Sequence, residues 1–143
     1  MKQDALWMRL REVDWGGYEV NSGRADKLPK LMQDLASRKV TRSMRASQEL
    51  WRLLCSGQLA TAAEPAIPFL VEIFRISSVE IQEEILDILK SCAIKLGNTE
   101  LGNASGIHSA LQHAQEHLAS DVSKSQEATL RERYAAFTAA LDM

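Results

Sequence analysis

Two stretches of the chain decide its fold: LPKLMQDLASRKVTRSMRASQELWRLL (28–54) and IPFLVEIFRISSVEIQEEILDILKSCA (67–93). They align when the sequence is shifted by 39 residues, which places Pro29 over Pro68. Apolar residues then match along both copies: Leu31 with Leu70, Leu35 with Phe74, Val40 with Val79, and Leu50 with Leu89. Each copy predicts a short helix with proline in its first turn, where backbone N–H groups have no intrahelical partner, and then a longer helix.

A third, more diverged copy covers residues 106–141, and the helix around Trp7, Leu10 and Val13 is expected to cap the N-terminal end. Apolar spacing predicts helices at about 3–13, 26–37, 41–56, 65–76, 78–96, 106–119 and 124–141. Helix pairs repeated about every 40 residues are typical of α-solenoids of the HEAT type. We therefore expect one all-α, HEAT-like domain over 1–143, with approximate repeats 26–56, 65–96 and 106–141.

Composition sets limits on the kind of protein this is. The chain has 143 residues, of which 45% are hydrophobic and 25% charged, with a net charge of −2. Residues 1–60 carry 11 basic and 7 acidic side chains, and residues 61–143 carry 6 basic and 12 acidic ones. The slight acidic excess disfavours a general nucleic-acid binder. The opening residues show no signal peptide, and no apolar run is long enough for a membrane span, so we expect a cytoplasmic protein.

The second helix of each pair carries the candidate partner-binding residues. Arg42, Arg45 and Arg52 form a basic ridge on one predicted helix, and Glu80, Glu83, Glu84 and Asp87 form an acidic ridge on the next. Adjacent ridges of opposite charge suit a protein partner with a complementary pattern. The alternative is an internal ladder of ion pairs, such as Arg45 with Glu84, each contributing about 0–1 kcal/mol. Trp51 is expected on the core face, and Trp15 is expected to cover the first repeat.

No catalytic or cofactor motif emerges from the sequence. His113 and His117 have the spacing of a helical metal-ligand pair, but His108 is badly placed as a third ligand, so we expect a solvated helix flank and no metal. Cys55 and Cys92 occupy similar places in consecutive repeats and are expected to be buried as small apolar residues. We predict no enzyme activity, no cofactor and no small-molecule substrate.

Two segments, VDWGGYEVNSGRADKLPKLMQDLAS (13–37) and RASQELWRLLCSGQLATAAEPAIPFLVEIF (45–74), resemble small bacterial HEAT-repeat proteins. The resemblance covers roughly residues 5–95, and its motif residues are Asp14, Trp15, Gly23, Pro29, Leu31, Ala60, Thr61, Pro65, Pro68, Phe69 and Leu70. Some members of that family look like immunity proteins of polymorphic toxins. The resemblance therefore implies a non-enzymatic protein that binds and neutralises a cytosol-acting toxin domain. The alternatives are a scaffold or adaptor subunit of a bacterial complex and, less favoured, a HEAT-type nucleic-acid-binding protein.

Overall fold

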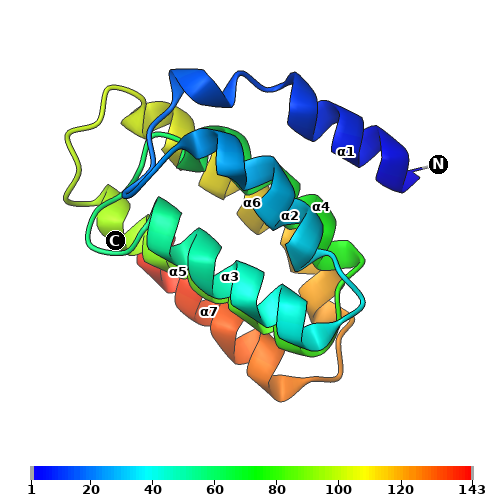
Figure 1. Cartoon of the computed structure of the whole chain (residues 1–143). Helices are drawn as coiled ribbons and strands as arrows, with labels where there is room; N and C mark the ends of the chain where they lie inside the picture. The colour runs from blue at the N-terminus through cyan, green and yellow to red at the C-terminus, as the bar shows by residue number, and fades with distance from the viewer. Residues whose placement is uncertain (1, 143) are drawn as a thin grey trace.

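The computed structural model describes residues 2–142, and in that range the chain is all-helical, as predicted (Figure 1). The terminal Met1 and Met143, which belong to the predicted domain 1–143, lie outside the described residues. The helices are α1 (Lys2–Glu12), α2 (Leu28–Leu35), α3 (Val40–Leu54), α4 (Ala63–Arg75), α5 (Val79–Leu96), α6 (Ala104–Ser123) and α7 (Ala128–Leu141). Short 3-10 helices form at Trp15–Gly17 and Ala25–Lys27.

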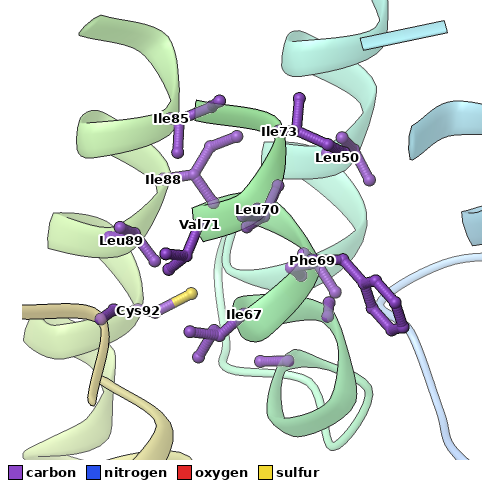
Figure 2. Close-up of a cluster of buried hydrophobic side chains, with 14 of the residues drawn as sticks. Leu50, Ile67, Phe69, Leu70, Val71, Ile73, Ile85, Ile88, Leu89 and Cys92 are labelled. Atoms are coloured by element: carbon purple, nitrogen blue, oxygen red, sulfur yellow. The ribbon is translucent and has the colours of Figure 1, made fainter. Parts of the chain in front are cut away.

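The long helices form two layers (Figure 1). In one layer α2 contacts α4 and α4 contacts α6; in the other α3 contacts α5 and α5 contacts α7. Each helix also packs against its chain neighbour across the layers, as α2 does against α3. The core lies between the layers: Figure 2 shows Leu70 and Ile73 of α4 among Leu50 of α3 and Ile85 and Ile88 of α5.

The predicted helix positions agree with the structure, with one correction at a proline. α4 begins at Ala63, so Pro68 is the sixth residue of the helix and not part of its first turn. In the first copy, the residues aligned with the first turn of α4 form the separate 3-10 helix Ala25–Lys27, and Pro29 is the second residue of α2. Alanines before Pro68 favour this earlier start, and Pro65 is tolerated because it lies in the first turn of α4.

The segment from Arg9 to Asn21 holds the N-terminal part against the rest of the molecule, and we call it the N-terminal strap. The two guanidinium Nη atoms of Arg9 donate to the carboxylate of Glu72 in α4 at 2.9 and 2.7 Å. Trp15 is 4% exposed, its Nε1 donates to the carbonyl of Leu10 at 2.7 Å, and its ring centroid lies 6.3 Å from that of Phe69. Trp15 is therefore buried, as expected of a covering residue, and its ring packs against α4, which belongs to the second predicted repeat.

The same strap also holds the end of α3. The side-chain amide of Asn21 donates to the carbonyls of Arg52, Ser56 and Gln58 at 2.8–3.1 Å, and its backbone N–H donates to that of Leu53 at 2.9 Å. Arg52 and Leu53 lie in the last turn of α3, where carbonyls have no intrahelical N–H partner, whereas Ser56 and Gln58 belong to the loop that follows. One side chain therefore terminates α3 and fixes the loop that leads to α4.

Candidate functional site

The predicted charged residues fall in four different places on α3 and α5. Arg52, Glu84 and Asp87 surround a depression between α3 and α5. Arg42 and Arg45 line a second depression, between α2 and α3. Glu83 faces α7, where it pairs with Arg133, and Glu80 is exposed in the first turn of α5. The residues of the predicted basic ridge and those of the predicted acidic ridge are thus each divided between different parts of the surface.

The depression between α3 and α5, which we call the Trp51 depression, has a volume of about 380 Å³. Its lining residues are Ser47, Gln48, Trp51, Arg52, Glu84, Asp87 and Ile88. Trp51 is 43% exposed, and its indole Nε1 donates to Ser91 Oγ on α5 at 3.2 Å. The prediction that Trp51 packs in the core was wrong, because Leu50, Leu53 and Leu54 occupy the buried side of α3.

A sequence signal for this exposure was available. In the 39-residue register Trp51 lies over Lys90, and lysine is almost never fully buried. The repeat alignment therefore already marks position 51 as one that faces away from the core. Hydrophobicity alone assigned it to the wrong side of the helix.

Opposite charges face each other across the Trp51 depression. On α3, Arg52 forms an ion pair with Glu49, and this bond raises the pKa of Arg52 and lowers that of Glu49. On α5, burial raises the pKa of Glu84, and the nearby Asp87 carboxylate raises it further. The rim of the depression therefore carries Arg52, already paired with Glu49, on one side and Glu84 and Asp87 on the other, with an exposed indole between them.

The acidic residues of α5 also join α5 to α7. Arg133 Nε lies 3.1 Å from Glu83 Oε2, Arg133 Nη1 donates to Asp87, and Thr129 Oγ1 donates to Glu83 Oε1 at 3.4 Å. None of the ion pairs within residues 2–142 joins Arg45 to Glu84, the rung proposed for an internal ladder. Sequence reasoning missed Arg133, because it considered only the α3–α5 contact.

The depression between α2 and α3, which we call the α2–α3 depression, has a volume of about 780 Å³. Its lining combines basic and apolar side chains with two carboxylates: Leu31, Asp34, Lys39, Val40, Thr41, Arg42, Arg45, Ala46 and Glu49. As expected for a cap at the N-terminal end, α1 contacts α2 and buries Leu6 and Leu10, and it reaches α4 through Arg9. No described side chain of α1 lines the α2–α3 depression.

The cysteines and histidines lie where the sequence placed them. Cys55 and Cys92 are fully buried, and the neighbouring Cys55 thiol, together with burial, raises the pKa of Cys92. His113 and His117 are exposed on α6 with ring centroids 6.4 Å apart. Among the described residues, no group of three or more His, Cys, Asp or Glu side chains is arranged to hold a metal ion.

Neither a search for membrane-spanning helices nor comparison with known proteins assigns a role to these residues. Within residues 2–142, no helix combines the length and apolar character needed to cross a membrane. Comparison with protein-family models, with curated proteins and with solved structures found no match.

Proposed function

We propose that this chain is a HEAT-like α-solenoid of three helix pairs that acts in the cytoplasm by binding another protein. Most specifically, we propose an immunity protein that binds and neutralises a cytosol-acting bacterial toxin. Two lines of support lead to the fold part of this proposal: the repeat register in the sequence, and the two layers in which each helix contacts the next but one. The toxin part rests on the resemblance of residues 5–95 to small bacterial HEAT-repeat proteins.

The Trp51 depression is the observation that carries the binding proposal. A tryptophan that is nearly half exposed on a rigid helix, with charged groups around it, has the character of an interface hot spot. The depression is small and lies between two packed helices, so it suits an inserted partner side chain. The flanking Arg52 and the pair Glu84 and Asp87 would select a partner with the reverse arrangement of charges.

The same charges disfavour nucleic acid on this face. Glu80, Glu84 and Asp87 would repel a phosphate backbone that approached Arg52. A scaffold role in a bacterial complex would use the same depression and differs only in the identity of the partner. The experiment therefore has to identify the partner and measure its activity.

We expect that the tagged protein captures a stoichiometric partner from a lysate of its source organism, and that Trp51→Ala does not. The partner is identified by mass spectrometry, expressed alone, and tested for toxicity in cells with and without the wild-type chain. Protection by the wild type and loss of protection by Trp51→Ala would support immunity. Capture of a housekeeping complex without any protection would replace immunity with the scaffold role, and recovery of nucleic acid alone would exclude both.

The size of the Trp51 effect follows from its exposure. An indole side chain offers up to about 250 Å², so 43% exposure leaves roughly 100 Å² for a partner to cover. At about 25 cal/mol per Å² this corresponds to roughly 2.5 kcal/mol, or about 70-fold in affinity. Met8→Ala is the matched control, because Met8 is an exposed apolar residue on α1. Thermal melts by circular dichroism confirm that both variants are folded at the temperature of the binding assay.

A further inference from the structure

The residue types that join α5 to α7 occur again on α3 and α7, the first and last helices of this layer. Thr129 and Arg133, the second and sixth residues of α7, contact Glu83, the fifth residue of α5. The second and sixth residues of α3 are Thr41 and Arg45, again a threonine and an arginine. The fifth residue of α7 is Glu132, again a glutamate. α3 thus carries the threonine and arginine of this contact, and α7 carries the glutamate.

These residues of α3 and α7 are exposed. Thr41, Arg45 and Glu132 are all solvent-accessible, and no ion pair within residues 2–142 includes Arg45 or Glu132. Inside the stack, α5 has a neighbour on each side, namely α3 and α7. α3 and α7 each have only one such neighbour within the part of the chain described. The outer sides of α3 and α7 therefore remain open to a helix of another molecule.

Apolar surface accompanies the charges at both ends. Beside Arg45, the α2–α3 depression of about 780 Å³ includes Leu31 and the half-exposed Val40. Beside Glu132, Ala135 and Ala139 are exposed on α7. Small side chains on one helix allow close approach to a partner helix, and the depression offers it apolar contacts. An ion pair alone would contribute little, but this combination resembles a helix–helix junction of the fold.

We propose that copies of this chain associate head to tail, with α7 of one copy against α3 of the next and Glu132 paired with Arg45. The recognition is local to the Glu132–Arg45 pair, because α7 as a whole carries Arg131 and Arg133 against Glu132. In a head-to-head contact the basic α3 of one copy would face the basic α3 of the other, and this like-charge contact disfavours that arrangement. The partner is therefore a second copy of this chain, recognised by the same pattern that joins α5 to α7.

This assembly has two consequences. A head-to-tail contact leaves one free α3 and one free α7 at the outer ends, so addition continues beyond a dimer. The contact also uses Thr41, Arg45 and Glu132 and leaves the Trp51 depression out of the interface. Self-association and partner binding are consequently separable, and failure of one proposal does not decide the other.

The first test is sedimentation velocity on the full chain at low and high salt, at concentrations up to about 0.5 mM, where weak association is detectable. We expect the average mass of the wild type to rise with concentration at low salt and to fall when salt is added. Arg45→Glu and Glu132→Arg should each weaken association by at least about tenfold, and the double variant should restore it. Arg11→Glu, the same charge change on α1, serves as the control and should associate like the wild type.

A protein that stays monomeric at low salt, or association unaffected by either reversal, would overturn the proposal. Direction is tested by cross-linking with a short bis-maleimide, since Cys55 and Cys92 are fully buried. A mixture of Arg45→Cys and Glu132→Cys should give cross-linked dimers that neither variant gives alone. Cross-links in the Arg45→Cys sample alone would indicate a symmetric dimer and contradict the head-to-tail arrangement.

Discussion

Replacing Gly106 with alanine should destabilise the protein, although glycine to alanine within a helix normally has the opposite effect. Gly106 is the third residue of α6, where the helix begins beside α4. A Cβ atom at this position would lie 2.6 Å from the Cδ atom of Glu64, closer than atoms can approach. The Glu64 carboxylate would have to leave the place where its Oε1 accepts a hydrogen bond from Asn103 Nδ2 at 2.9 Å.

Two opposing contributions decide whether Gly106→Ala stabilises or destabilises the protein. Alanine gains about 0.5–1 kcal/mol over glycine through backbone entropy in the helix. Loss of a hydrogen bond to a charged group costs about 1.5–3 kcal/mol, and the low end applies because this bond is only partly buried. Moving the carboxylate away from the first turn of α6 also removes a favourable interaction with the helix dipole. We expect a net loss of about 0.5–1 kcal/mol, or roughly 2–4 °C in Tm for a chain of this size.

A double-mutant cycle with Glu64→Ala isolates the cause. Once the carboxylate is absent, Gly106→Ala should stabilise by about 0.5–1 kcal/mol, so the coupling between the two positions is roughly 1.5 kcal/mol. The free energy of unfolding is measured by urea denaturation followed by far-UV circular dichroism. Gly102→Ala is the control, because no atom lies within 4 Å of the Cβ that it would gain. Gly106→Ala could instead stabilise the wild-type protein as much as it stabilises the Glu64→Ala variant. That result would refute the contact between Glu64 of α4 and Gly106 of α6.

Three further predictions concern the α5–α7 junction and the buried thiols. Arg133→Ala should lower the free energy of unfolding by about 1 kcal/mol in urea denaturation, because it removes two partly exposed ion pairs, whereas the exposed Lys124→Ala should not. Glu84→Gln should raise Tm at pH 7, because burial raises the pKa of Glu84 in the folded state above its ordinary 4.5. That gain should shrink as the pH falls through the folded-state pKa and vanish below 4.5; an equal gain at all pH values would contradict it. Cys55 and Cys92 should not react with a thiol reagent in the native protein, and both should react in denaturant; rapid native labelling would contradict their burial.

The repeated apolar pattern predicted the helices well because burial leaves a strong periodic signal. Leu31, Leu35, Leu50 and Leu89 lie on the core-facing sides that their spacing indicated, and Leu111, Leu118 and Phe137 are buried on the two helices predicted in residues 106–141. Positions at the edge of a helix face are harder to assign. Trp51 lies one residue from Leu50, and its ring is large enough to contact α5 while remaining partly exposed.

The candidate site was harder to predict than the fold, because charged side chains reach different neighbours from the same helix. Glu83 and Glu84 are adjacent in sequence, yet Glu83 pairs with α7 and Glu84 lines the Trp51 depression with α3. Arg45 and Arg52 lie on one helix, but they line different depressions. Such divisions depend on how far each helix is rotated against its neighbour, which apolar spacing does not determine to within one residue.

The N-terminal strap affects the order in which the helices open during local unfolding. Stacked helix pairs usually open one at a time from either end, since each contacts only its neighbours. Here Arg9 and Trp15 reach α4, and Asn21 holds the last turn of α3, so the first pair cannot separate without releasing the second. Opening should therefore start at α6 and α7, and amide hydrogen exchange should become progressively slower from the C-terminal pair towards α3 and α4. We therefore expect the N-terminal helix pair to be the last to open.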